Sequence, residues 1–325
     1  MPASDQDHDL ALPPAHATLR QWRQWLISCW RQAGIAEAGQ EAELLLSWVL
    51  AAGQKGHQAW DDRAGLVLAA DRPLSSAQIE KLRQAAARRG RREPLAYIIG
   101  EWEFWSLPFA VDPGVLIPRP ETELLVEEAL RLAPQLRGGA GRPLTILDLG
   151  TGSGILAVVL ARELAPARVI AVDRSPAALA VARRNVCRHR VESRVSLLAA
   201  DWLSALAAGK ALFDLVVANP PYVEDVALPG LEPEVRDYEP RQALDGGAAG
   251  MAQIRRLAAE LPPFLRPGGG LLMEIGWDQQ GVVEQLLAPD NAWREVRILP
   301  DLAGLPRLLR CRRSLDGGKG NIKVT

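Results

Sequence analysis

The sequence predicts an α/β protein in which a small helical domain precedes a larger domain built on a mostly parallel sheet. From residue 144 onward, short apolar runs alternate with helical segments, which is typical of parallel strands covered by helices on both faces. Up to residue 92, by contrast, apolar residues recur only at helical spacing. A chain of 325 residues is also long enough to form two separate cores.

Three helices are expected in the first part. One helix contains Trp22, Trp25 and Leu26, which fall on a single face, and a second runs from about residue 38 to 52. The third is announced by Ser75 and Gln78, which form a capping-box pair. It ends in an arginine-rich stretch, which we interpret either as a solvated helix end or as a docking surface for an acidic protein face: Arg83, Arg88, Arg89, Arg91 and Arg92.

In the second part, the apolar runs predict seven strands, most of them parallel. The expected strands span residues 144–149, 169–172, 195–198, 212–218, 271–275, 295–300 and 307–311. Helices are expected at about 155–164, 176–187 and 252–265. We expect the last strand to be antiparallel and inserted beside the fifth.

Two aromatic and β-branched runs, residues 97–105 and 107–111, predict a hairpin between the two parts, although Pro108 restricts the second run to a sheet edge. The expected organisation is therefore a disordered leader over 1–16, a helical domain over 17–92, a hairpin linker over 93–117, an α/β domain over 118–312 and a polar tail over 313–325.

Composition excludes several classes of protein. A net charge of −1 argues against a general nucleic-acid binder, which needs a surplus of basic residues to neutralise phosphates. The three cysteines form no CxxC pair, so no zinc site is expected, and their sparse number suits a reducing compartment. No apolar run reaches the roughly eighteen residues of a membrane span. We therefore expect a cytoplasmic protein without metal or membrane partners.

A glycine-rich loop follows the first predicted strand of the second part and opens a helix, a position at which parallel sheets bind ligands. The loop consists of Gly150, Thr151, Gly152, Ser153 and Gly154. It is a poor dinucleotide fingerprint, because the third glycine position falls on Ile155, and no Gly-Lys-Ser/Thr follows to make it a phosphate-binding P-loop. The loop suits a ligand that has no pyrophosphate.

Acidic and aromatic residues end the next two predicted strands. Asp173 stands where a carboxylate can accept both hydroxyls of a ribose, although a strand-end aspartate also often caps a helix. Asp201 and Trp202 follow the third strand, where an acid can accept the amino group of adenine and an indole can cover its ring. An aromatic residue that simply packs beside a loop is the alternative.

The fourth predicted strand ends in Asn219, Pro220, Pro221 and Tyr222. Two prolines fix the backbone and leave carbonyl groups without local N–H partners, while asparagine offers an acceptor oxygen and tyrosine a flat face. This combination suits a planar –NH2 group, whose two hydrogens are accepted while its plane is stacked.

Together, residues 150–154, Asp173 and residues 219–222 resemble the class I amino-methyltransferases. The flanking stretches, residues 94–98, 100–104, 116–123 and 239–244, resemble the HemK/PrmC family, and the resemblance covers about residues 74–312. It implies that residues 118–312 form an S-adenosyl-L-methionine-dependent methyltransferase domain with a class I (Rossmann-like) sheet of seven strands, and that the helical domain over 17–92 docks the substrate. S-adenosyl-L-methionine is the implied cofactor. Peptide chain release factors are the implied partners, methylated on the glutamine of their Gly-Gly-Gln motif.

The resemblance also implies roles for the residues. The glycine loop, Asp173, Trp202 and Asn219 would bind the cofactor. Residues 219–222 would bind the substrate, with Asn219 and Tyr222 as the catalytic residues. Two alternatives stay open: an adenine-N6 methyltransferase of DNA or RNA, which uses the same Asn-Pro-Pro-Tyr stretch, and a non-catalytic module that binds only the cofactor.

Overall fold

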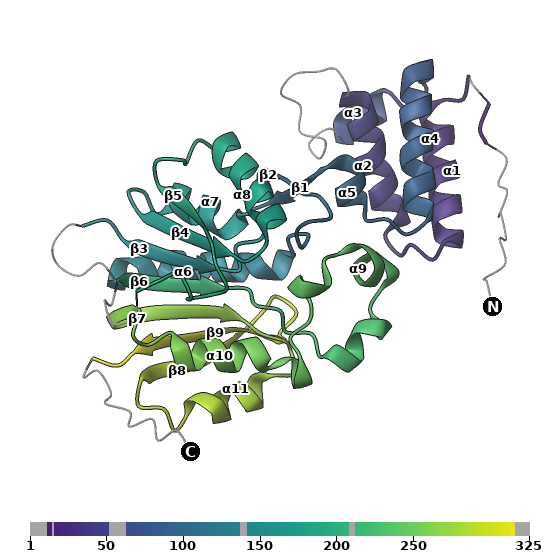
Figure 1. Ribbon diagram of the computed structural model, residues 1–325. Coiled ribbons are helices and arrows are strands. Elements are labelled where there is room, and N and C mark those ends of the chain that lie inside the picture. The colour runs from purple at the N-terminus through teal and green to yellow at the C-terminus, as the bar shows by residue number, and fades with distance from the viewer. Residues whose placement is uncertain (1–11, 15, 52–62, 137–141, 208–211, 316–325) are drawn as a thin grey trace. The chain divides into compact units, whose positions relative to one another are not determined.

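The computed structural model describes residues 12–14, 16–51, 63–136, 142–207 and 212–315 (Figure 1). Most of the predicted leader and of the predicted polar tail lies outside these residues. The chain divides into a helical unit, made of the residues up to Gly100 together with Pro233–Tyr238, and a sheet unit made of the rest. The finer domain limits expected from the sequence remain predictions.

The helical unit is organised around tryptophan and leucine side chains. Its core includes Trp22, Leu26, Leu45 and Leu82, which are fully buried. All three predicted helices are confirmed, and Ser75 and Gln78 form the expected capping box. The helices of this unit are α1 (Leu19–Gln32), α2 (Ala38–Ala51), α3 (Arg63–Leu68), α4 (Ser76–Gly90), α5 (Leu95–Ile99) and α9 (Pro233–Tyr238).

The prediction of a strand beginning at residue 97 is wrong for its first part. Residues Leu95–Ile99 form helix α5, which begins after Pro94 and ends at Gly100 with a φ of 80°. The run is apolar throughout because its residues are buried, so strand-like composition and a buried helix look alike over so short a segment. The hairpin itself is shorter: β1 (Glu101–Phe104) pairs antiparallel with β2 (Leu107–Ala110).

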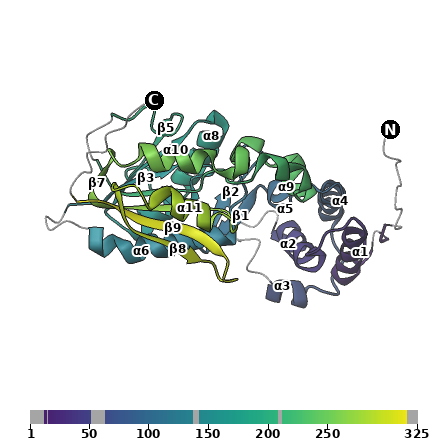
Figure 2. The same ribbon diagram turned by 90° about the horizontal axis from the view of Figure 1, so that it is seen from below.

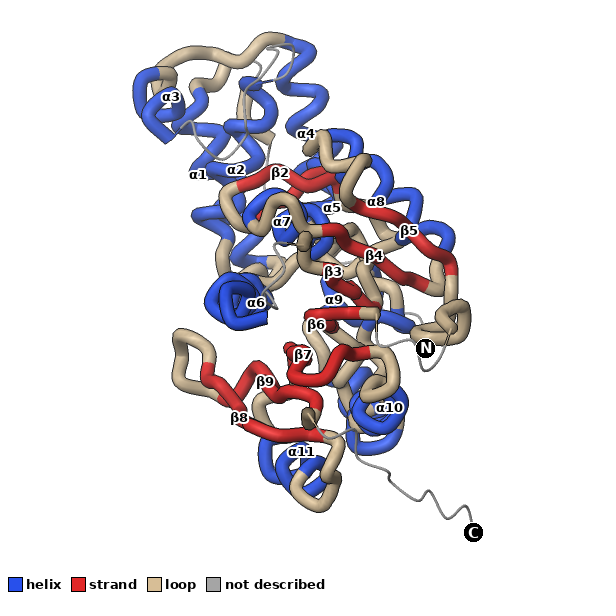
Figure 3. The backbone as a smooth tube through the Cα atoms, turned by 90° about the vertical axis from the view of Figure 1, so that its left-hand side faces the viewer, coloured by secondary structure: helices blue, strands red, loops and turns tan. Residues whose placement is uncertain are grey.

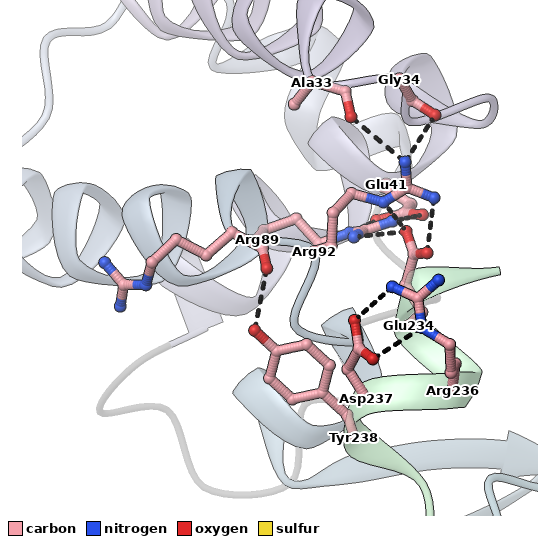
Figure 4. Close-up of polar contacts among 10 residues, drawn as sticks. Ala33, Gly34, Glu41, Arg89, Arg92, Glu234, Arg236, Asp237 and Tyr238 are labelled. Atoms are coloured by element: carbon pink, nitrogen blue, oxygen red, sulfur yellow. Dashed lines mark hydrogen bonds and ion pairs between the residues drawn. The ribbon is translucent and has the colours of Figure 1, made fainter. Parts of the chain in front are cut away.

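Both interpretations of the arginine-rich stretch are wrong for Arg89 and Arg92 (Figure 4). Arg89 is only 3% exposed; its Nε donates to Glu41 at 2.5 Å, and its Nη1 lies 2.8 Å from Glu234. Arg92 pairs with the same Glu234 at 2.6 Å. These arginines therefore hold α9, a helix far along the chain, within the helical unit, and Arg88 is likewise paired, with Glu93.

The described residues of the sheet unit form a seven-stranded sheet with the strand order β5-β4-β3-β6-β7-β9-β8, which can be followed from top to bottom in Figure 1. The strands are β3 (Thr145–Leu149), β4 (Arg168–Asp173), β5 (Val195–Ala199), β6 (Phe213–Ala218), β7 (Leu265–Glu274), β8 (Trp293–Pro300) and β9 (Pro306–Arg313). The first five are parallel, and β9 lies antiparallel between β7 and β8. The predicted fold class and the insertion of the last strand beside the fifth are confirmed.

Helices cover both faces of this sheet. One apolar core contains α6 (Glu123–Leu136), α7 (Ile155–Glu163) and Val186 of α8 (Pro176–Arg188). The other contains α10 (Ala252–Glu260) and α11 (Gln280–Leu287). Figure 3 shows α6 and α10 on opposite sides of the sheet, and Figure 2 shows α11 beside β8. Because helices cover both faces, a strand such as β6 is buried along its whole length, which explains its mainly apolar sequence.

One predicted helix is shorter than expected. The helix foreseen over 252–265 ends at Glu260, because Pro262 and Pro263 cannot supply the N–H groups that would continue it. Strand β7 then begins at Leu265, well before the predicted start at residue 271. Within the described part of the chain, no helix combines the length and apolar character needed to cross a membrane.

Candidate functional site

The site residues come from the ends of four neighbouring strands, β5, β4, β3 and β6, and three of these strand ends are in register. Leu149, at the end of β3, is in register with Val172 of β4 and with Ala218 of β6. The residues that follow, Gly150 and Asn219, and Asp173 at the end of β4, therefore meet at one edge of the sheet. The chain runs from β3 to β4 on one side and later places β6 on the other, so this edge is the point at which the strand order reverses, where such sheets bind ligands.

The glycine loop is shaped by backbone requirements at two positions. Gly150 has a φ of 70°, and a Cβ there would lie 3.3 Å from the Trp202 ring. Gly154 has a φ of 82°, directly precedes α7, and would press a Cβ against Ala182 at 3.1 Å. Both positions combine a left-handed backbone with a close neighbour, which is why glycine stands there.

A buried acid lies beneath this loop. Asp148 is fully buried, and its Oδ2 accepts the Thr151 hydroxyl at 2.6 Å. Its Oδ1 has no hydrogen-bonding partner among the described residues. Burial raises the pKa of the Asp148 carboxyl from 3.8 to about 7. The Asp148 carboxyl in the cofactor half of the site therefore gains or loses its proton near neutral pH.

Asp173 is held in one orientation by two backbone donors. Gly152 N–H donates to its Oδ2 and Ser175 N–H to its Oδ1, both at 2.9 Å. The cap of α8 is Ser175, whose hydroxyl accepts the Ala178 N–H, so Asp173 is not needed as the helix cap. Its half-buried carboxylate lines the cavity and keeps lone pairs that a ribose could use.

Trp202 lies over the glycine loop with its indole anchored, because its Nε1 donates to Gln253 at 2.8 Å. The neighbouring Asp201, expected to accept an adenine amino group, forms an ion pair with Arg256 at 2.7 Å. Both acid and indole line the same cavity. The structure thus places both predicted residues that follow β5, Asp201 and Trp202, at the cavity, and Asp201 is already paired with Arg256.

The Asn219–Tyr222 turn is held in place by side chains to which none of the strand-end motifs pointed. Asn219 Nδ2 donates to the Thr122 hydroxyl at 3.3 Å, and the Tyr222 hydroxyl donates to Glu274 at 2.9 Å. Gln279 donates to the Tyr222 carbonyl at 3.1 Å. Of the four turn residues, Asn219 and Pro221 line the cavity. Stacking of an amide plane on Tyr222 remains a prediction.

The cavity between the glycine loop and this turn has a volume of about 130 Å³. Its features fit S-adenosyl-L-methionine: the glycine cradle that a Cβ at Gly150 would fill, the oriented carboxylate of Asp173, and the Trp202 indole. Across the described ranges there is no group of three or more His, Cys, Asp or Glu that could hold a metal ion.

Two further stretches line the cavity, and only the family resemblance had pointed to them. They are residues 118–122, with Arg119 and Thr122, and residues 240–245. Arg119 pairs at 2.5 Å with the buried Glu239, which also accepts the Ile117 N–H at 3.2 Å. A signal was present at one more residue, Glu274, an acid within the otherwise apolar run 271–275.

The fold and the cavity define a class I methyltransferase that uses S-adenosyl-L-methionine. A solved structure of the hMettl16 catalytic domain, in complex with the MAT2A 3′UTR hairpin 6, shares this fold with a TM-score of 0.51 at 14% identity, over 73% of this chain and 81% of that one. Residues 21–100 match the PrmC N-terminal domain, and residues 124–230 match the methyltransferase small domain.

Curated relatives narrow the class to one family. The chain is 42% identical to the release factor glutamine methyltransferase of Geobacter sulfurreducens, over 82% of this chain and 87% of that one. It is 41% identical to the enzyme of the same name from Caulobacter vibrioides, over 86% and 91%. The chain belongs to the release factor glutamine methyltransferase family, the HemK/PrmC family that its motifs resemble.

Proposed function

We propose that this protein transfers the methyl group of S-adenosyl-L-methionine to the side-chain amide nitrogen of the glutamine in the Gly-Gly-Gln motif of peptide chain release factors. The carrying observation is Asn219: its Nδ2 is engaged by Thr122, whereas its Oδ1 accepts no hydrogen bond from the described residues. An acceptor oxygen at the edge of the cofactor cavity is the group that a substrate amide hydrogen needs.

The task of the site is orientation. An amide nitrogen is a weak nucleophile because its lone pair is shared with the carbonyl group. Asn219 Oδ1 and the Pro220 carbonyl would accept its two hydrogens and aim the nitrogen at the methyl group, where positioning provides much of the acceleration. The bound cofactor would supply the methyl group: the amide nitrogen would bond to it as the carbon–sulfur bond breaks, sulfur would keep the electron pair, and one amide hydrogen would pass as a proton to water.

The cofactor half has its own roles in this proposal. Gly150–Gly154 and Trp202 would line the bound cofactor, and Asp173 would accept its ribose hydroxyls. The bound cofactor supplies an activated methyl group on a sulfonium. Neither base reading of nucleic acid nor a membrane is required, and the reaction would take place in the cytoplasm, where release factors work.

Methyl transfer with labelled cofactor tests the proposal. Purified protein is incubated with labelled S-adenosyl-L-methionine and a release factor, and the label is located by mass spectrometry. We expect it only on the Gly-Gly-Gln glutamine, and a release factor carrying glutamate there should accept none, because a carboxylate brings no hydrogens to the two acceptors. Labelling of DNA or RNA instead would identify an adenine-N6 enzyme, and cofactor binding without transfer would identify a binding module.

A further inference from the structure

A chain of hydrogen bonds runs from Asn219 into the interior of the sheet unit. Asn219 Nδ2 donates to Thr122 Oγ1 at 3.3 Å, and the Thr122 hydroxyl donates to Glu274 Oε2 at 2.7 Å. The other carboxylate oxygen, Oε1, accepts the Tyr222 hydroxyl at 2.9 Å. Thr122 is 1% exposed and Glu274 is 2% exposed, so water does not compete for these bonds.

With Glu274 ionised, the number of available hydrogens fixes the direction of this chain. A threonine hydroxyl has one hydrogen and otherwise only lone pairs, and an ionised carboxylate can only accept. Once Thr122 gives its hydrogen to Glu274, it can offer Asn219 nothing but a lone pair. Asn219 must then turn its –NH2 group toward Thr122 and its Oδ1 away from it. The opposite rotation of the amide would place two acceptors face to face.

We propose that Thr122 and Glu274 are positioning residues, which fix the rotation of the Asn219 amide so that its Oδ1 is the atom presented to the substrate. This inference rests on the proposed function, in which Oδ1 accepts a hydrogen of the substrate amide. Neither residue touches the reacting atoms; both act through Asn219.

Burying an acid at position 274 costs free energy of folding, so its presence indicates a specific role. Burial raises the pKa of Glu274, while the hydroxyls of Thr122 and Tyr222 and the charge of Arg307 lower it, and Glu121 raises it. A glutamine of the same shape would avoid burying a charge. It would, however, carry one donor group, which could donate to Thr122 and release the threonine hydrogen toward Asn219. Only a carboxylate accepts on both sides and excludes the wrong rotation.

Turnover measurements on matched variants test the proposal. Thr122→Val keeps the shape without the hydroxyl, and Glu274→Gln keeps the shape but replaces one of the two acceptor oxygens by an amide donor. Each should lower kcat for release factor methylation by about 10- to 100-fold, as expected for a misplaced orienting group, with the cofactor Kd and the release factor KM changed less than about twofold. Thr122→Ser, which keeps the hydroxyl, should recover most of the loss. Thr145→Val, the same substitution on β3 outside the cavity lining, should leave kcat unchanged.

A double-mutant cycle separates positioning from a general structural role. If Thr122 acts through Asn219, Thr122→Val should have no further effect in an Asn219→Ala background, because the group that it orients is gone. The same fold-loss in both backgrounds would overturn the proposal. So would unchanged turnover in both Thr122→Val and Glu274→Gln.

A second measurement needs no substrate. In 15N spectra, the side-chain amide hydrogens of Asn219, identified by their disappearance in Asn219→Ala, should exchange with water more slowly in the unmodified protein than in Thr122→Val. Equal exchange rates would overturn the proposed orientation. Protection in the unmodified protein together with no transfer to release factors would overturn the proposed function and still support the orientation, so the two failures are distinguishable.

Discussion

The glycine loop and the Asn219–Tyr222 turn follow neighbouring strands, β3 and β6, yet they are fixed in different ways. The loop is held by groups within it and by the adjacent strand β4: the Thr151 hydroxyl donates to Asp148, and the Gly150 and Thr151 N–H groups donate to the Val172 carbonyl. The turn is held by Thr122, Glu274 and Gln279, which lie 97, 52 and 57 residues from their partners. The cofactor half of the site is therefore fixed mainly by its own strand and the neighbouring β4, whereas the acceptor half is fixed by side chains more distant in the sequence.

Because the loop lies over a buried acid, the stability of the folded protein should depend on pH through Asp148. The folded protein binds the proton on the Asp148 carboxyl more tightly than the unfolded chain does, because the pKa of this carboxyl is near 3.8 in the unfolded chain. The stabilisation that comes from the raised pKa is therefore complete below about pH 4 and is lost as the pH rises to about 7. The loss is on the order of 4 kcal/mol of unfolding free energy. Denaturation of the cofactor-free protein across this range measures it, and Asp148→Asn should lack this component. Parallel pH curves for the two proteins would contradict it.

The acceptor half should depend most directly on Asn219. Asn219→Ala should lower turnover by about 10²- to 10³-fold, as when one orienting contact is lost from a closed site, and should weaken cofactor binding far less. Steady-state kinetics and calorimetry measure the two effects. The control is Asn291→Ala, at an exposed asparagine outside the cavity lining. Full activity in Asn219→Ala would exclude the proposed role of the turn.

A side chain added at Gly250, behind the Asn219–Tyr222 turn, should displace the turn. Gly250 has a φ of 65°, and a Cβ there would lie only 2.1 Å from the Tyr222 carbonyl oxygen. Gly250→Ala should cost about 3 kcal/mol of stability through overpacking and backbone strain, and should impair methyl transfer. Gly304→Ala is the matched control, since its φ is 79° but no heavy atom lies within 4 Å of its Cβ. Equal losses of Tm in the two variants would show that the contact with the turn is unimportant.

Removing the oriented carboxylate at the end of β4 should affect the cofactor half alone. Asp173→Ala should weaken cofactor binding by about 1 to 3 kcal/mol, because ribose hydroxyls lose a charged acceptor. At saturating cofactor, turnover should largely return. Calorimetric affinity that stays unchanged would remove Asp173 from the binding site.

The smallest effect is expected at the Tyr222 hydroxyl. Tyr222→Phe leaves the ring in place and leaves Glu274 with Thr122, so turnover should fall by less than about tenfold, the equivalent of about 1.4 kcal/mol. Tyr222→Ala removes the ring as well and should be the more damaging change in the same assay. If Phe and Ala lowered turnover equally, the hydroxyl rather than the ring would be the important group.

The sequence by itself determined the features that adjacent residues encode. Apolar runs and helical periodicity predicted the two-part α/β architecture, and Ser75 with Gln78 predicted a helix start, because these signals depend on backbone conformations a few residues long. The glycine loop, Asp173 and residues 219–222 could be selected for the same reason. Each is a strand-end motif, and parallel strands bring their carboxyl ends to one edge.

Only the tertiary structure decided which distant side chains meet. That Thr122 and Glu274 reach Asn219 and Tyr222, or that Arg89 is buried against Glu41 and Glu234, depends on topology and register, which have no local signature. A buried polar group must find a partner, but the sequence does not say which one. The partner is chosen when the strands and helices pack, because hydrogen bonds and ion pairs form wherever the fold brings complementary groups within about 3 Å.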